Sequence, residues 1–150
     1  MSNLTHPLRV LFYTLILFLF STANLSAQEI KQYFYQGTID NRPIRLYLKQ
    51  LPNSCGGSDI YEAIYQYGKG KNWIELLNQN NDKGNFCFTE IRFTGVLLLK
   101  RTDHHLDGIW ISPDGKRQLK VSLSQQNINA KEIEELEERL ERTHYENFDC

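Results

Sequence analysis

Residues 44–50 read IRLYLKQ, and this stretch decides how the rest of the chain is interpreted. Three apolar residues alternate with three polar or amphipathic ones: Ile44, Leu46 and Leu48 against Arg45, Tyr47 and Lys49. Because successive side chains of a β-strand point to opposite faces, this period of two predicts a strand with one buried face.

Seven further strand-like segments surround this one, separated by turn residues. They are residues 30–39, 59–67, 72–79, 85–92, 94–101, 105–112 and 116–124. Their connections are too short for the crossover that parallel pairing needs, so we expect an antiparallel meander. Eight such strands can close into a barrel that side chains fill or that holds one small ligand. We predict an all-β, lipocalin-like up-and-down barrel over residues 28–128, with a two-sheet sandwich as the alternative.

Residues 129–150 differ in character and predict a helix followed by a short tail. Asn129 and Glu132 have the spacing of a capping box. Ile133, Leu136 and Leu140 form one narrow apolar stripe at helical spacing. We expect about four turns of helix that cover part of the barrel wall; a partner-binding helix is the alternative.

The first 27 residues have the layout of a secretory signal peptide. Arg9 supplies a positive charge, residues 10–20 form an unbroken apolar run, and small residues follow up to Ala27. The run is shorter than the roughly 20 residues of a bilayer span. We expect cleavage after Ala27 rather than an uncleaved anchor, and a periplasmic or secreted mature chain without a stable membrane span.

The charge of the mature chain argues against nucleic-acid binding. Removing the leader takes away one of 17 basic residues and none of the 18 acidic ones, which leaves a net charge of −2. Nucleic-acid binding needs a concentrated basic face, and no basic run exceeds two residues. We therefore expect no nucleic-acid partner.

Three cysteines, Cys55, Cys87 and Cys150, lie in the mature chain. Export permits a disulfide, and the odd count leaves one thiol over. In an up-and-down barrel Cys55 and Cys87 lie at the same end, about 9.5 Å apart, which exceeds the limit of about 7 Å between α-carbons. Folding of loop 53–57 over the intervening strand would close that gap. We expect a Cys55–Cys87 disulfide, with a Cys150 bond to the barrel as the alternative.

Several short motifs carry a resemblance to a group of proteins. They are Gly37-Thr38-Ile39, Pro43-Ile44, Leu46 with Leu48, Tyr65 and Tyr67-Gly68, Thr94-Gly95, Leu106, Gly108 and Trp110, and Ser112-Pro113-Asp114-Gly115-Lys116. The chain resembles a loose group of small exported bacterial all-β proteins of lipocalin-like or avidin-like type over about residues 33–123. The chain departs from the pattern at Ala63, where the group tends to have Gly, and at Cys55 and Cys87. The resemblance implies a barrel and carries over no catalytic residue.

Residues 104–121, HHLDGIWISPDGKRQLKV, look most like a site but favour two strands and a turn. Residues 112–115, SPDG, are typical of a turn, because Pro fixes φ and Gly accepts a positive φ. His104 and His105 would point to opposite faces of a strand, and a zinc site needs further ligands. We expect no metal and no cofactor.

Catalysis finds little support in the sequence. No Gly-x-Ser-x-Gly elbow and no Gly-rich phosphate loop is present. Glu62, Glu75 and Glu90 lie on expected strands, and two of them facing each other would favour a hydrolase. We expect the protein not to be an enzyme, and a hydrolase is the weakest of three hypotheses.

Aromatic residues on the strands favour a binding function. Tyr65 and Tyr67 share one face of their strand, and Trp110 is expected in the core. Such side chains can line a small-molecule pocket or fill the barrel. The first hypothesis is a binding module that holds a small apolar or amphipathic ligand in the barrel, with Tyr65, Tyr67 and Trp110 as contacts. The second is a solid barrel that acts as an inhibitor or envelope-protein partner.

Overall fold

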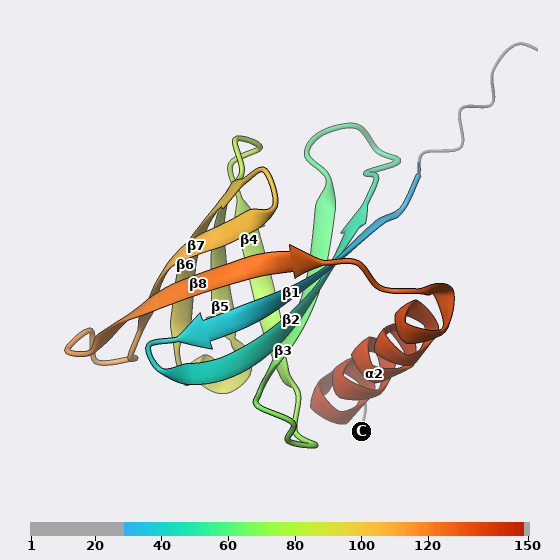
Figure 1. Ribbon diagram of the computed structural model, residues 1–150. Coiled ribbons are helices and arrows are strands. Elements are labelled where there is room, and N and C mark those ends of the chain that lie inside the picture. The colour runs from blue at the N-terminus through green and yellow to red at the C-terminus, as the bar shows by residue number, and fades with distance from the viewer. Residues whose placement is uncertain (1–28, 149–150) are drawn as a thin grey trace, which may run out of the picture.

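The computed structural model describes residues 29–148 and shows a closed barrel of eight antiparallel strands with one helix against its outer wall (Figure 1). The strands are β1 (Lys31–Ile39), β2 (Arg42–Leu51), β3 (Ile60–Tyr67), β4 (Ile74–Asn80), β5 (Asn85–Glu90), β6 (Val96–Thr102), β7 (His105–Ile111) and β8 (Gln118–Gln126). Each strand pairs with the next, and β8 pairs with β1. The predicted antiparallel barrel is confirmed, and the sandwich is wrong. The predicted leader, residues 1–27, lies outside the described residues.

Strand β2 shows why the barrel closes. Its alternation holds: Ile44, Leu46 and Leu48 point inward and are at most 2% exposed. Its polar face points outward, but Tyr47 on that face is fully buried, because the helix covers it. One strand face therefore builds the core and the other builds the contact with the helix.

Most strand ends differ from the sequence prediction by one or two residues, and two of them bear on the site. Strand β4 begins at Ile74, so Trp73 lies in the loop before it. Strand β5 ends at Glu90, and the 3₁₀ turn η1 (Ile91–Phe93) follows. Arg92 and Phe93 have φ angles of 66° and 55°, a left-handed conformation that breaks the strand ladder.

Side chains fill the inside of the barrel. Every strand contributes at least one buried side chain to a single core: Tyr35, Ile39, Ile44, Leu46, Leu48, Ala63, Tyr65, Leu76, Phe86, Phe88, Leu97, Leu99, Leu106, Val121 and Leu123. Eight strands enclose an interior that side chains of this size can occupy. The structure therefore corresponds to a solid barrel.

Two glycines make this packing possible. A Cβ at Gly108 would lie 1.9 Å from the carbonyl oxygen of Leu98 on the neighbouring strand. A Cβ at Gly95 would lie 2.2 Å from the indole nitrogen of Trp110. Gly108 thus permits close backbone approach, and Gly95 makes room for the tryptophan.

The helix α2 (Ala130–Phe148) has 19 residues, about five turns and so about one turn more than predicted. The capping box is confirmed: the backbone N–H of Glu132 donates to Asn129 Oδ1 at 3.0 Å, and that of Asn129 donates to Glu132 Oε2 at 2.9 Å. Leu136 and Leu140 pack on Phe34, Tyr47 and Ile64 of the barrel wall, as the apolar stripe predicts.

Candidate functional site

The three aromatic residues predicted to contact a ligand meet at the end of the barrel that carries the β3–β4 and β5–β6 turns, the lower end in Figure 1. Trp110 Nε1 donates to Glu90 Oε1 at 2.6 Å, and Tyr65 Oη donates to the same oxygen at 2.5 Å. The rings of Tyr65 and Tyr67 are 5.4 Å apart, edge to face. Glu90 is 3% exposed and also accepts a hydrogen bond from Thr94.

This cluster closes the lower end. Burial, followed by the hydrogen bond to Glu90, raises the pKa of Tyr65 far above its usual range, so its hydroxyl stays a donor. Three donors satisfy one buried carboxylate, which is how a charge is kept in a core. In the structure Tyr65 and Trp110 satisfy Glu90, and Tyr67 packs on Tyr65; their contact with a ligand stays a prediction.

The carboxylates do not form a catalytic pair. Glu90 points into the barrel opposite Leu76, whereas Glu75 is opposite Ile64 on the outer face. The sheet itself separates the two buried carboxylates, and Glu62 is exposed. The geometry that would favour a hydrolase is absent from these residues.

The opposite end of the barrel is closed by a cation among aromatic rings. The Arg101 guanidinium carbon lies 5.0 Å from the ring centre of Tyr33, 5.5 Å from that of Phe86 and 5.9 Å from that of Tyr61. Burial raises the pKa of the neighbouring Tyr35. Cation–π contacts of this kind stabilise a desolvated guanidinium. Both barrel ends are thus plugged by side chains.

The stretch 104–121 is two strands and their turns. His104 lies in the tight turn between β6 and β7, and the Nδ1 atom of His105 is 3.3 Å from Ser124 Oγ. The predicted turn at 112–115 is confirmed by the 2.8 Å bond from the N–H of Gly115 to the carbonyl of Ser112. Within residues 29–148, no group of three or more His, Cys, Asp or Glu side chains is placed to hold a metal.

The predicted Cys55–Cys87 disulfide is wrong, because both cysteines are free thiols in the structure. Cys87 lies within β5, opposite Leu98, and shares the outer face with Thr89. Cys55 lies in the exposed turn after β2, held by a bond from its N–H to Asn53 Oδ1. Cys150 lies outside the described residues.

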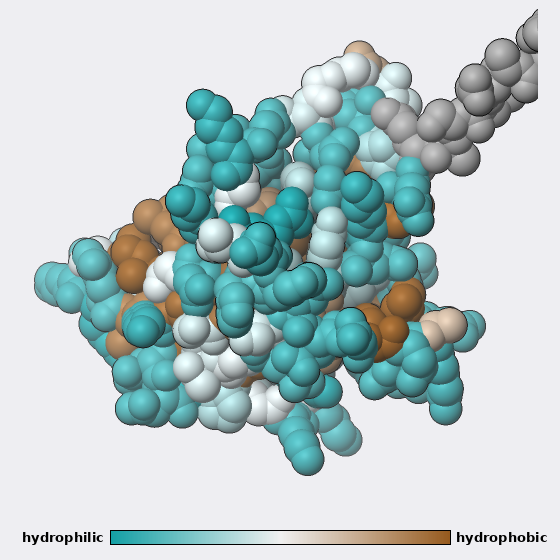
Figure 2. Space-filling model, turned by 45° about the horizontal axis from the view of Figure 1, so that its top comes forward, coloured by the Kyte–Doolittle hydropathy of each residue, from teal (hydrophilic) through white to brown (hydrophobic). Residues whose placement is uncertain are grey.

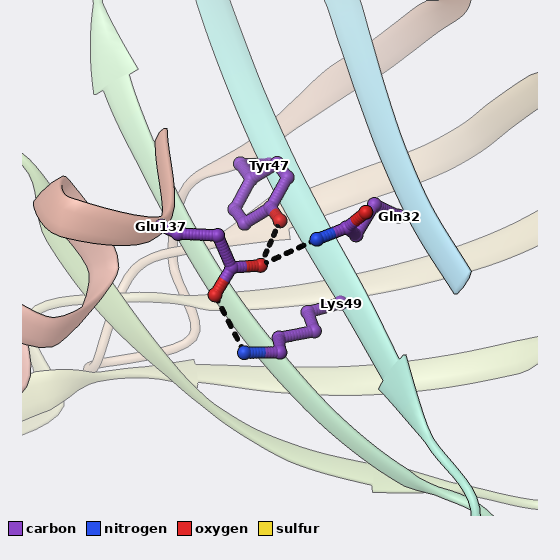
Figure 3. Close-up of polar contacts among 4 residues, drawn as sticks. All are labelled: Gln32, Tyr47, Lys49 and Glu137. Atoms are coloured by element: carbon purple, nitrogen blue, oxygen red, sulfur yellow. Dashed lines mark hydrogen bonds and ion pairs between the residues drawn. The ribbon is translucent and has the colours of Figure 1, made fainter. Parts of the chain in front are cut away.

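Glu137 attaches the helix to the barrel wall (Figure 3). Its Oε1 accepts from Gln32 Nε2 at 2.8 Å and from the hydroxyl of Tyr47, and its Oε2 is 2.5 Å from Lys49 Nζ. Burial works against ionisation, but the hydrogen bonds from Lys49, Tyr47 and Gln32 outweigh it and hold the pKa of Glu137 below its usual range. Burial and the bond to Glu137 raise the pKa of Tyr47.

A second anchor lies one turn from the helix end. Glu75 Oε1 is 2.7 Å from His144 Nδ1, and its Oε2 accepts from Asn147 Nδ2 at 2.9 Å. The two anchors join α2 to the outer face of β1, β2 and β4. The helix therefore forms one side of a cleft whose other side is the barrel wall.

This helix–wall cleft has a volume of about 590 Å³, in the range of small-molecule sites. Four cationic side chains line it, Arg45, Lys71, Arg139 and Arg142, against two acidic ones, Glu132 and Glu135. Its apolar lining is Phe34, Trp73, Ile128 and Leu136. The cleft combines an apolar floor with an excess of positive charge.

Two polar groups in the cleft wall are buried and have no hydrogen-bond partner within residues 29–148: Arg45 Nε and Gln66 Oε1. Gln66 is fully buried, and its Nε2 donates to the carbonyl of Gly70 at 2.9 Å. Because a carbonyl only accepts, this bond fixes which end of the amide is left unpaired. The Arg45 guanidinium carbon lies 5.7 Å from the ring centre of Trp73.

Sequence reasoning did not find this cleft. Arg45 and Gln66 sit on the outward faces of β2 and β3, where polar residues are ordinarily solvated, and only the register pairs them. One weak signal exists: Glu137 lies beside Leu136 and Leu140 on the helix face that packs on the barrel. A charged residue at that place indicates a polar contact under the helix.

Comparison with known protein families, curated proteins and solved structures gives no match to this chain. The resemblance to exported all-β proteins therefore stays a prediction. Among the residues that the structure describes, no helix has both the length and the apolar character needed to cross a membrane.

Proposed function

We propose that the protein is an exported, non-enzymatic binding module that holds a small amphipathic ligand in the helix–wall cleft and uses the solid barrel as a scaffold. The observation that carries this proposal is that the barrel interior is filled, whereas the helix–wall cleft has open space. Side chains fill the barrel and plug both ends. The cleft instead has about 590 Å³ of space beside its two unpartnered groups. The barrel also holds two buried polar groups without partners within residues 29–148, Tyr35 Oη and Arg101 Nη1, but packed side chains surround them.

The free-energy cost of the two unpaired groups supports ligand binding in the cleft. A buried donor or acceptor without a partner costs about 1–3 kcal/mol. A ligand that supplied the missing partners would remove that cost, so its binding is favoured at this place. The apolar floor would take the nonpolar part of an amphipathic molecule.

The alternative, a protein-interaction surface, has weaker support. The large exposed hydrophobic side chains are spread over the segment before β1, the strands, the η1 turn and the helix end: Ile30, Ile60, Leu77, Phe93, Leu98, Tyr145 and Phe148. Figure 2 shows a face that is mainly hydrophilic, with hydrophobic side chains in separate areas. Protein-binding surfaces more often expose one contiguous apolar patch.

The test uses 8-anilinonaphthalene-1-sulfonate, an amphipathic anion, with calorimetry on the folded protein. Gln36 lines the cleft and is exposed, so Gln36→Trp fills the space without disturbing the core. We expect this variant to bind the probe at least about tenfold more weakly, a loss of about 1.4 kcal/mol. Gln118→Trp, on β8 outside the cleft lining, is the matched control and should bind within about twofold of the parent chain. Equal binding by all three proteins would contradict the proposal.

A further inference from the structure

The two unpaired groups of the helix–wall cleft are direct neighbours. Arg45 on β2 and Gln66 on β3 are register partners, and both side chains point to the outer face. Directly opposite residues have Cβ atoms about 5 Å apart. Both Arg45 Nε, which donates, and Gln66 Oε1, which accepts, are buried. One small chemical group meets both of them where the two side chains part to admit it.

The group that fits must accept one hydrogen bond and donate another on the same side. A trans amide does not do so, because its N–H and C=O point in opposite directions. A single amino-acid residue in an extended conformation does, because its own N–H and C=O point to the same side, as in an antiparallel strand. The backbone of one extended residue therefore matches the pair, as a hydroxyl group or a primary amide also does; the charge of the cleft distinguishes them.

Charge indicates which residue of a peptide this would be. The cationic side chains of the cleft outnumber the acidic ones by two. Both acids also have partners: Glu132 caps the helix, and Glu135 is 3.9 Å from Lys131. A carboxylate would be attracted by the remaining cations, and guanidinium–carboxylate bonds are among the stronger hydrogen bonds.

We propose that the helix–wall cleft binds the carboxyl-terminal residue of a peptide or an N-acylated amino acid. Its N–H donates to Gln66 Oε1, its carboxylate accepts from Arg45 Nε, and its side chain lies on the apolar floor beside Phe34 and Trp73. The stacking of Arg45 on Trp73 holds the guanidinium in place for this contact. This inference rests on the proposed function and names the ligand class of the same site.

The test compares three probes by calorimetry: N-acetyl-L-leucine, its carboxamide, and 4-methylpentanoate, which has the same carbon chain without the acetamido group. We expect N-acetyl-L-leucine to bind at least about tenfold more tightly than either analogue. The carboxamide can still accept from Arg45 but lacks the negative charge, and 4-methylpentanoate lacks the N–H that donates to Gln66.

Variants assign the two preferences to the two residues. Arg45→Gln should reduce the preference for the acid over the carboxamide to within about twofold, and Gln66→Met should do the same for the preference over 4-methylpentanoate. Lys120→Gln, an equal charge change on β8 outside the cleft, should leave both ratios unchanged. Ratios are compared within one variant, so a loss of stability alone does not change them.

Three equal affinities in the parent chain, or ratios that survive both variants, would overturn the inference. If the naphthalene sulfonate still binds and Gln36→Trp still weakens it, then the proposed function stands and only the ligand class is wrong. If neither kind of probe binds in the cleft, both proposals fail.

Discussion

The contact of Glu137 with the barrel wall gives the sharpest prediction about stability. Glu137→Ala removes the acceptor of Gln32, Tyr47 and Lys49 at once. Tyr47 is fully buried, so leaving its hydroxyl without an acceptor costs about 1–3 kcal/mol. The side chains of Lys49 and Glu137 are 17% and 21% exposed, so loss of their ion pair adds only about 1 kcal/mol. Gln32 is partly exposed and can turn to water.

We therefore expect Glu137→Ala to lower the free energy of unfolding by about 2–4 kcal/mol. The measurement is urea unfolding followed by circular dichroism. Glu138→Ala is the matched control, since Glu138 is the next residue of the same helix and is exposed. It should change the free energy by less than about 0.5 kcal/mol. If the two variants have equal stability, the helix is not held by Glu137 and the account of the cleft is refuted.

Four further predictions concern pH, the core and the thiols. Folding lowers the pKa of Glu137, so its contribution to the free energy of unfolding should be complete above about pH 5 and lost as the pH falls further. In urea unfolding at several pH values, Glu137→Gln should lose less stability between about pH 5 and lower pH than the parent chain does. Glu90→Gln should cost about 2–4 kcal/mol, because its three donors lose a charged acceptor; an unchanged thermal midpoint would argue against a closed lower end. Gly108→Ala should abolish folding or cost more than about 3 kcal/mol, as circular dichroism would show, whereas a stable variant would contradict the close approach to β6. Cys55 should react quickly with a thiol reagent without prior reduction, and a slow reaction that reduction accelerates would restore the disulfide prediction.

The sequence predicted the barrel well because its signals are local. Alternation such as that of residues 44–50 reports the buried face of one strand, and turn residues report where strands end. The capping box and the apolar stripe of the helix are local signals too. Strand ends were less exact where the backbone leaves the ladder in a left-handed conformation, as at Arg92 and Phe93.

The sites were harder to predict because they depend on contacts between distant segments. Tyr65, Tyr67 and Trp110 were expected together and do lie together, but their common partner Glu90 comes from β5. Whether a barrel is hollow or solid depends on the volume of all inward side chains, which no single motif reports. The helix–wall cleft arises only from the register of β2 with β3 and from the docked helix.

The disulfide prediction failed for a related reason. It required a loop conformation that glycines permit but that nothing in the sequence requires. In the structure the loop instead bonds across to the β4–β5 turn, through Ser58 and Asp82. Glycine allows many loop conformations, so it predicts a particular one only where a contact also stabilises that conformation.

The most direct test of the central claim, a solid barrel with a ligand site outside it, follows the two tryptophan indole N–H signals by NMR. The chain has two tryptophans: Trp73 lines the cleft, and Trp110 is bonded to Glu90 inside the barrel. Trp73→Phe assigns the two signals. On titration with 8-anilinonaphthalene-1-sulfonate, we expect the Trp73 signal to shift with saturation and the Trp110 signal to stay. A shift of Trp110 with Trp73 unmoved would mean that the ligand enters the barrel, and it would contradict the account.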